Sequence, residues 1–379
     1  MSSPTDLTTE DGLRSYLKAN GRSKEVSVTL LSGGTANYVY RVAGIHGFTS
    51  IFKHAAPYLH SNHNFALDPT RMDYEAQALD ILSPADSVSP ISRLLPRSTV
   101  HAVRLLSYDK EKKLLCIEDG GSQNLKDSYG DQKLDIAKAG EELGKWIAAL
   151  HMCSTTISLA LPDQKEAVEE NRSKNNPVAV QIYRHSYRNL YTALSQYGHD
   201  TKLADRINED FGSLLETDDE CVCHGDYWPG NVLVRLYPTQ DKPADLTIVD
   251  FEMVRRGTSA TDVGQFAAEA FLLDRFRGGR GLLPVFLNEY IRARKENPHN
   301  STVLDRAWLK RVVVHWAVHV AFWPTRVEWT DSAGTQELVD IGVGVLKAVL
   351  DDDWEKLLLS PLFKDVKGAL GSVLEAHSG

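Results

Sequence analysis

The spacing of apolar residues predicts a small sheet in the first third of the chain. Short runs rich in β-branched and aromatic side chains predict five strands, at 26–31, 38–42, 49–53, 100–106 and 113–117. They would pair as one antiparallel sheet. Helices are expected over residues 5–19, where Leu13 and Leu17 share a face, and over 70–82. The segment 54–69 contains prolines and asparagines and is predicted to be a loop.

Beyond Gly121 the pattern becomes helical. Apolar residues from Ile136 to Leu150 recur at the spacing of an amphipathic helix. Further helices are expected over 178–197, 202–216, 262–274, 283–295, 304–324 and 334–358. Between them, the apolar runs 232–234 and 246–249 predict a hairpin with its turn at 238–243, and the polar segment 164–176 predicts a loop or frayed helix. The fold class is therefore α+β: an N-terminal lobe over 1–119 with a small antiparallel sheet, and a mostly helical C-terminal lobe over 120–379.

Composition is that of an ordinary globular protein. The 379 residues are 42% hydrophobic and 25% charged, and the chain is long enough for two lobes. The net charge of −9 provides no basic field for nucleic acid, so no nucleic-acid partner is expected. The acidic surface is compatible with a cationic small molecule, although solubility explains it equally well.

Cysteine usage and hydropathy indicate a cytoplasmic protein with no membrane association. The four cysteines form no disulfide framework, and Cys221-x-Cys223 has the wrong spacing for a zinc knuckle or a redox pair. The N-terminal residues lack the basic and apolar regions of a signal peptide. The most apolar helical segment, 312–323, is too short to span a bilayer.

One motif carries the chemistry. Asp226 and Asn231 lie in the segment His224-Gly-Asp-Tyr-Trp-Pro-Gly-Asn231, and Asp250 follows in Val249-Asp-Phe-Glu252. Metal-assisted phosphoryl transfer needs a carboxylate that orients the attacking hydroxyl, together with an amide oxygen and a second carboxylate that hold Mg²⁺. The predicted hairpin would bring Asn231 and Asp250 to neighbouring strand ends. We therefore assign Asp226 as the base, and Asn231 and Asp250 as the metal ligands.

These motifs, followed by Gly257-x-x-x-x-Asp262-Val-Gly, resemble the aminoglycoside phosphotransferase and choline kinase family of small-molecule kinases. Segments 31–37 and 52–59 are similar to the branch that contains methylthioribose kinase and fungal 4-hydroxytryptamine kinase. The resemblance implies a bilobal protein-kinase-like fold, with ATP and Mg²⁺ as cofactors. It covers most of the chain, from about residue 7 to the helices near Trp323.

Nucleotide-binding residues are expected in the N-terminal lobe. The loop between the first two strands contains Ser32, Gly33, Gly34, Thr35 and Asn37, whose backbone N–H groups could close over phosphates, although a Gly-Gly pair can also be a plain turn. Lys53 ends a strand and Glu75 lies in the next helix, the pairing by which kinases aim an ammonium at phosphates. Glu118 and Asp119, at the lobe connector, would offer backbone groups to the adenine.

Other residues have supporting or open roles. The segment 224–231, which carries Asp226 and Asn231, is called the catalytic loop. Asp262 is expected to support it by hydrogen bonds, and His224 to be structural. Glu252 either contacts metal or substrate, or is an exposed strand-end residue. His315, His319 and Trp323 share one helix face; they either form a wall around the acceptor or belong to a core helix. Five arginines could contact phosphate, but a basic surface is the simpler interpretation: Arg255, Arg256, Arg275, Arg277 and Arg280.

The sequence thus predicts an ATP-dependent phosphotransferase with an alcohol acceptor on a small molecule. Methylthioribose-like sugars and hydroxytryptamine-like amines lead the acceptor classes, ahead of choline-like alcohols and antibiotics. A protein kinase and a catalytically silent nucleotide-binding protein are the alternatives. Either a monomer or a homodimer is compatible with the sequence.

Overall fold

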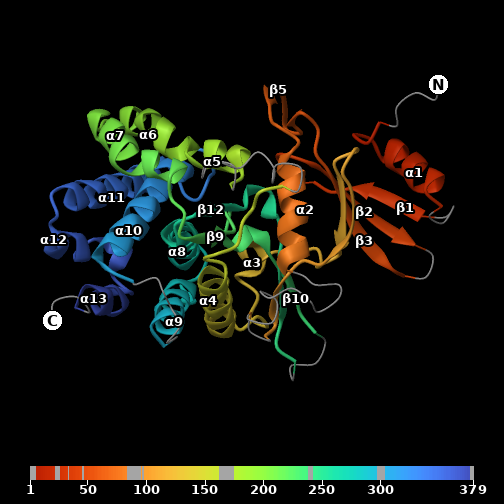
Figure 1. Cartoon of the computed structure of the whole chain (residues 1–379). Coiled ribbons are helices and arrows are strands. Elements are labelled where there is room, and N and C mark those ends of the chain that lie inside the picture. Colours follow the sequence, from red (N-terminus) through yellow and green to blue (C-terminus); the bar gives the residue numbers. More distant parts are fainter. Residues whose placement is uncertain are drawn as a thin grey trace.

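Two lobes, one built on a sheet and one on helices, make up the protein in the computed structural model (Figure 1). The structure describes residues 6–21, 26–32, 34–44, 47–82, 95, 98–161, 175–237, 242–296 and 304–375. Gly33 lies outside these residues, as do most of the segment 164–176 and four residues of the turn at 238–243.

The sheet lobe confirms the predicted five-stranded antiparallel sheet. Its strands lie in the order β1 (Val26–Leu30), β2 (Tyr38–Gly44), β3 (Thr49–His54), β8 (Leu114–Glu118) and β7 (Leu105–Asp109). Alternating side chains bury both faces. Phe52 packs in a cluster with residues of α1 (Glu10–Ala19), whereas Ile51 joins the main core that includes α2 (Arg71–Leu82).

Part of the predicted fourth strand is paired elsewhere, so the expectation of one strand over 100–106 is wrong. β6 (Val100–Ala102) pairs in parallel with β11 (Asp245–Ile248), in a sheet of order β10-β11-β6. Val103 N then donates to the Ile248 carbonyl oxygen at 2.8 Å, before β7 begins at Leu105. A short apolar run fits either sheet, and only tertiary pairing decides between them.

The predicted loop at 54–69 contains a hairpin instead. β4 (Tyr58–Leu59) pairs with β5 (Asn62–Ala66), and every residue of β5 is exposed. Leu67 N closes the base of the hairpin on the Pro57 carbonyl oxygen at 3.2 Å. Because the sequence of this hairpin is polar and lacks an alternating apolar face, hydrophobic periodicity gives no sign of it.

The helical lobe packs around long buried helices. Its helices are α3 (Leu125–Ser128), α4 (Ile136–Cys153), α5 (Pro177–Tyr183), α6 (His185–Gln196), α7 (Lys202–Ile207), α8 (Ser259–Phe276), α9 (Leu282–Glu296), α10 (Arg306–Phe322), α11 (Ser332–Leu350), α12 (Trp354–Leu358) and α13 (Lys367–Glu375). Gly144 allows α4 to approach α9, since a Cβ there would lie 2.7 Å from the Phe286 carbonyl oxygen. Two predicted helices, at 178–197 and 334–358, are each broken in two.

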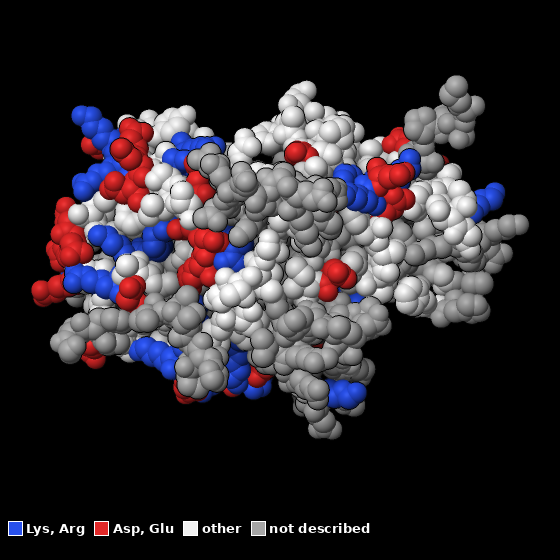
Figure 2. Space-filling model, in the orientation of Figure 1, with Lys and Arg blue, Asp and Glu red and all other residues white. Residues whose placement is uncertain are grey.

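Small strands complete this lobe and carry the motif residues. β10 (Val232–Arg235) and β11 form the predicted hairpin, and β9 (Cys221–Cys223) pairs with β12 (Arg255–Gly257). Among the described helices, none combines the length and apolar character that a bilayer crossing requires. On the face shown in Figure 2, acidic and basic side chains are intermixed over the helical lobe.

Candidate active site

The motif residues Asp226 and Asn231 lie on the loop between β9 and β10, and their side chains meet. Asn231 Nδ2 donates to Asp226 Oδ2 at 2.9 Å and to the Asp226 carbonyl oxygen at 3.0 Å. Gln265 Nε2, from α8, donates to Asp226 Oδ1 at 2.6 Å. The carboxylate therefore has a fixed orientation, with one oxygen held by its own loop and the other by α8.

The environment of Asp226 raises the pKa of its carboxyl group toward neutral pH. Burial raises the pKa of Asp226 to about 7, and the negative charge of Asp250 acts in the same direction. Hydrogen bonds from Gln265, Asn231 and Trp228 to the carboxylate oppose this rise in pKa. A carboxyl group with a pKa near the working pH is suited to accepting a proton and releasing it again.

Asp262, at the start of α8, holds the catalytic loop by its backbone. Its carboxylate accepts from His224 N at 2.7 Å and from Gly225 N at 3.0 Å, which confirms the predicted supporting role. Gly225 has φ +84°, and a Cβ there would lie 1.8 Å from the Met253 carbonyl oxygen. Only glycine fits this position.

His224 is structural, as expected. Its Nδ1 accepts from the Asp226 backbone N at 3.2 Å, so Nε2 carries the proton and donates to the Val249 carbonyl oxygen at 3.1 Å. Burial lowers the pKa of His224 and keeps the ring neutral. The ring thereby ties the catalytic loop to the segment that carries Asp250.

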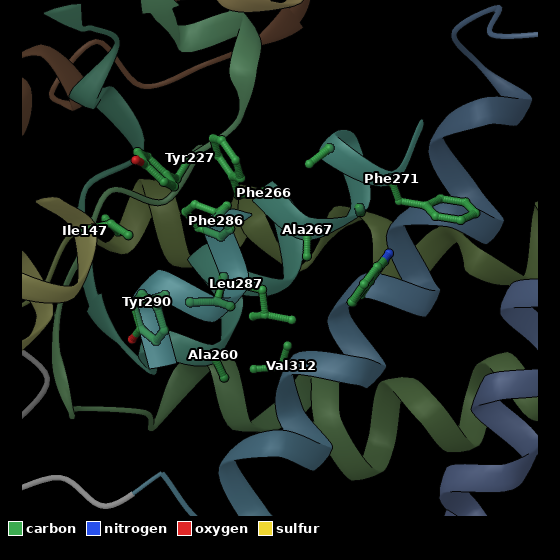
Figure 3. Packing of buried hydrophobic residues seen from close by; sticks show 14 of the residues in the cluster. Ile147, Tyr227, Ala260, Phe266, Ala267, Phe271, Phe286, Leu287, Tyr290 and Val312 are labelled. Carbon is green, nitrogen blue, oxygen red and sulfur yellow. The ribbon is translucent and has the colours of Figure 1, made fainter. Parts of the chain in front are cut away.

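The residue after Asp226 anchors the loop in the core. Tyr227 is fully buried, stacks on Phe266 with ring centroids 5.1 Å apart, and donates to the Leu143 carbonyl oxygen at 3.2 Å. Figure 3 shows this ring beside Phe266 and Phe286 in the aromatic core of the helical lobe. A rigid core thus fixes the position of Asp226.

Lys53, Glu75 and Asp250 are brought together from three elements. Lys53 Nζ, on β3, donates to Glu75 Oε2 of α2 at 2.7 Å and also contacts Asp250 Oδ1. Asp250 has a left-handed backbone conformation (φ 68°, ψ 59°), which is uncommon outside glycine and is typical of functional sites.

The charges of this cluster stabilise one another. Burial acts to lower the pKa of Lys53, but the charges of Asp250 and Glu75 outweigh it and hold that pKa above its ordinary value. Burial also acts to raise the pKa of Asp250, and the Lys53 ammonium overcomes it, so this pKa lies below its ordinary value. Lys53 is therefore cationic and Asp250 anionic at neutral pH.

Glu252 belongs to a second buried cluster. Its Oε2 accepts from Asn37 Nδ2 at 2.8 Å and from Arg71 Nε at 3.1 Å. Arg71, which is fully buried, also donates to the Ala36 carbonyl oxygen at 3.2 Å and to the Leu67 carbonyl oxygen at 3.2 Å. Glu252 is thus 7% exposed, and it connects the helical lobe to the loop between β1 and β2.

A cavity of about 640 Å³ lies between the lobes at these clusters, and we call it the Lys53 cavity. Its lining includes the following residues expected to bind nucleotide: Ser32, Gly34, Thr35, Asn37, Lys53, Glu75 and Glu118. Asp119 does not line it. The Asp119 carboxylate instead accepts from Arg41 Nε at 2.7 Å, and Arg41 and Gly121 hold the pKa of Asp119 low despite its partial burial.

A second cavity, of about 380 Å³, adjoins the first, and we call it the aromatic cavity. Its lining includes Glu252, His315, His319 and Trp323, together with apolar side chains from both lobes. The two cavities share four lining residues: Thr35, Ala36, Asp226 and Glu252. Asp226 therefore lies where the two cavities meet.

The histidines of α10 combine both expectations for this helix, since they are buried, bonded and part of a cavity wall. His315 lies between the Tyr183 and Tyr187 hydroxyls, at 3.0 Å from each, and stacks on the Tyr183 ring. His319 Nε2 lies 2.8 Å from Glu269 Oε1. Burial lowers the pKa of His315 well below its ordinary value, so its ring is neutral.

Sequence reasoning missed Gln265, Tyr183 and Arg71. The signal for Gln265 was its position three residues after Asp262 on one helix, which places both side chains toward the catalytic loop. Nothing in the sequence marked Arg71. The expectation of a basic surface was wrong for Arg255 and Arg256, which are buried; the Arg255 guanidinium lies 3.6 Å from the Tyr183 ring centroid.

Comparison with known proteins identifies the class as a small-molecule phosphotransferase. The Phosphotransferase enzyme family (APH) matches residues 27–303, and the chain belongs to this family. The family resemblance and the α+β fold class stated from the sequence are thus confirmed, as is the enzyme class, an ATP-dependent phosphotransferase that acts on a hydroxyl.

Relatives match most of the chain. The 4-hydroxytryptamine kinase of Psilocybe cyanescens is 27% identical over 375 residues, covering 95% of this chain and 98% of that protein. The 4-hydroxytryptamine kinase of Psilocybe cubensis is 25% identical over 383 residues, with the same coverage. Among solved structures, the Plasmodium vivax ethanolamine kinase aligns with a TM-score of 0.48 and 13% identity, covering 99% of this chain and 90% of that one.

Proposed function

We propose that this protein is a Mg²⁺-dependent kinase that transfers the γ-phosphoryl group of ATP to the hydroxyl of a small aromatic amine. The observation that carries the proposal is the position of Asp226 at the junction of the two cavities. ATP would occupy the Lys53 cavity and the acceptor the aromatic cavity. Their reacting ends would then meet at one carboxylate.

The sheet lobe supplies the nucleotide contacts in this proposal. Lys53, oriented by Glu75, places its ammonium toward the phosphates, and the loop that includes Ser32, Gly34, Thr35 and Asn37 covers them. Glu118 and Asp119 present backbone groups at the connector between the lobes. The division into a nucleotide-binding lobe at 1–119 and a lobe with the acceptor site at 120–379 belongs to the same proposal.

The donor atoms near Asp250 fit a hard divalent cation. Asn231 uses its amide nitrogen to bond Asp226, which leaves the amide oxygen as its ligand atom. Carboxylate oxygens of Glu75, Asp250 and Glu252 lie within 4.8 Å of one another. Oxygen ligands of this kind are those that Mg²⁺ prefers, so Asn231 and Asp250 would hold it. The bound ion would neutralise charge on the transferring phosphoryl group.

Asp226 performs the proton transfer. It accepts the proton of the acceptor hydroxyl as that oxygen bonds to the γ-phosphorus and the bond from phosphorus to the ADP oxygen breaks. Gln265 and Asn231 keep the carboxylate pointed at the hydroxyl. Most of the rate enhancement comes from this positioning and from charge neutralisation.

The aromatic cavity favours an aryl amine over a sugar. Leu59, Phe65, Ile182, Met253 and Trp323 supply apolar surface that an aromatic ring would cover more completely than a methylthioribose-like sugar, whose ring carries hydroxyls. Asp226 and Glu252, the latter paired with Arg71, present carboxylate oxygens that can accept hydrogen bonds from an ammonium. The two relatives, both named 4-hydroxytryptamine kinase, agree with this acceptor class.

The test is ADP release by purified protein with MgATP and a panel of acceptors: 4-hydroxytryptamine, methylthioribose, choline and kanamycin. We expect turnover with the hydroxyaryl amine and its loss in Asp226→Asn. Turnover with methylthioribose alone would overturn the acceptor class but keep the kinase. No turnover with any acceptor, together with tight MgATP binding, would favour a silent nucleotide-binding protein.

A further inference from the structure

The β4–β5 hairpin lies beside the aromatic cavity. Figure 1 shows it projecting above α2 at the border between the lobes. Leu59 of β4 and Phe65 of β5 line the aromatic cavity, as does Leu67 just after the hairpin. A segment that the sequence predicted to be an irregular loop therefore forms part of the wall of the aromatic cavity.

The turn of the hairpin is fixed to the loop shared by the two cavities. Ser61 N and Ser61 Oγ each donate to the Thr35 carbonyl oxygen at 3.0 Å, and His60 N donates to the Ala36 carbonyl oxygen at 3.3 Å. The His60 ring also lies 4.3 Å from the Tyr38 ring, centroid to centroid. These contacts give the hairpin a defined position relative to the loop between β1 and β2.

Phe65 is exposed in spite of this anchoring. Its side chain is 47% exposed, although it is aromatic and lies at a cavity that also contains Trp323 and Tyr183. Phe48, just before β3, is more exposed, at 62%, and lines neither cavity. Burying the remaining apolar surface of Phe65 would favour binding of a ligand that covers it.

We propose that Phe65 is a specificity-determining residue that covers the aromatic ring of the acceptor. This inference rests on the proposed function and extends it to a residue of the sheet lobe. The acceptor ring lies between Phe65 on one side and the aromatic residues of the helical lobe on the other. Aromatic contact of this kind favours flat aryl acceptors over aliphatic ones, because only a ring covers the exposed part of Phe65.

The test compares Phe65→Ala and Phe65→Leu with the matched control Phe48→Ala. Each variant is assayed with a hydroxyaryl amine and with an aliphatic hydroxy amine such as choline or ethanolamine. For the aryl acceptor, Phe65→Ala should raise KM by about tenfold, with kcat and the KM for ATP unchanged. Phe65→Leu should recover only part of this loss, because leucine restores apolar area but no ring contact, and Phe48→Ala should behave as wild type.

Two further measurements separate specificity from folding. The thermal unfolding temperature and ATP affinity of Phe65→Ala should equal those of wild type, because the hairpin is held by backbone bonds. For any aliphatic acceptor that wild type uses, the KM should change little. An equal rise in KM for both acceptor classes, or no rise, would overturn this inference while wild-type turnover of the aryl amine still supports the proposed function. Absence of wild-type turnover with every aryl amine would overturn both.

Discussion

The residues around the two adjoining cavities differ in chemical character. Around the Lys53 cavity, one ammonium lies among the carboxylates of Glu75, Asp250 and Glu252, so the site is organised by charge. Around the aromatic cavity, His315 is held neutral between two tyrosine hydroxyls, so the site is organised by ring packing and neutral hydrogen bonds. Asp226 belongs to both cavities.

This difference separates what each side must do. Phosphates carry the same charge in every reaction of this type, so a fixed set of charged residues serves them. An acceptor is recognised by its shape and its polar groups, and a wall of rings and neutral donors discriminates between acceptors. Mutations on the charged side should therefore cause large effects with any acceptor, whereas those on the aromatic side should cause smaller effects that depend on the acceptor.

The residue shared by both cavities should give the largest effect. Asp226→Asn removes the group that accepts the hydroxyl proton, and we expect kcat to fall by about 10³-fold or more with every acceptor. Isothermal titration calorimetry should show that the variant still binds a non-hydrolysable analogue of MgATP. Asp210→Asn, an exposed carboxylate on the helical lobe, is the control and should keep full activity. Substantial turnover by Asp226→Asn would exclude its role as base.

Lys53→Met tests the charged side. Removing the ammonium leaves buried Glu75 and partly buried Asp250 without their cation, so the KM for ATP should rise by about 10²-fold and the thermal unfolding temperature should fall. Burial already raises the pKa of Glu75 to about 7, so without Lys53 this carboxyl is mostly protonated, and adding Glu75→Gln should change stability little and restore no activity. Lys347→Met on α11 serves as the control. Recovery of activity in the double variant would contradict the assigned role of Lys53.

The pKa of Asp226 predicts a pH-dependent stability. In the folded protein this carboxyl takes up its proton near pH 7, compared with about 3.9 in an unfolded chain. Its contribution to stability is therefore fully present below about pH 4 and is lost as the pH rises through about 7.

Asp226→Asn removes that dependence. The difference in unfolding free energy between variant and wild type should increase in favour of the variant by on the order of 2 kcal/mol from pH 5 to pH 8. This value is reduced for the part of the side chain that reaches solvent. Urea unfolding at the two pH values measures it, and the difference at pH 5 subtracts the cost of altered hydrogen bonds. A difference between variant and wild type that is independent of pH would show that Asp226 titrates normally.

The smallest effect should come from the aromatic side. The Tyr183 hydroxyl lies within hydrogen-bond distance of the Gln265 side-chain oxygen, the His315 ring and the Thr261 carbonyl oxygen. Because Gln265 also donates to Asp226, Tyr183 links that carboxylate to the wall of the aromatic cavity. Tyr183→Phe should lower kcat by about fivefold and leave the KM for ATP unchanged. The control is Tyr191→Phe, an exposed tyrosine. A change confined to the KM for ATP would show that Tyr183 supports nucleotide binding instead of the acceptor side.

The parts of the site that the sequence predicted are those encoded by consecutive residues. The catalytic loop and the strand end at Asp250 follow from local spacing, and the β10–β11 hairpin brings Asn231 and Asp250 together as that spacing implies. The five-stranded sheet followed from strands with apolar faces. In each case, a pattern within a few residues determines the geometry.

The unpredicted parts depend on contacts between distant segments. Arg71 and Glu252 are 181 positions apart, and Gln265 reaches Asp226 across 39 positions. Burial of Arg255 is equally invisible in a sequence where arginines usually lie at the surface. The β4–β5 hairpin escaped prediction because backbone bonds to Thr35 and Ala36 hold it, and such bonds leave no trace in side-chain pattern.

The wall shared by the two cavities has a consequence for inhibitor chemistry. Since Thr35, Ala36, Asp226 and Glu252 line both spaces, a ligand in one cavity ends where a ligand in the other begins. A compound that links an adenosine phosphate to an aryl amine through a short tether would occupy both at once. The tether replaces a second binding event by an intramolecular one, with an effective concentration on the order of millimolar. The aryl half of such a compound would then carry the selectivity.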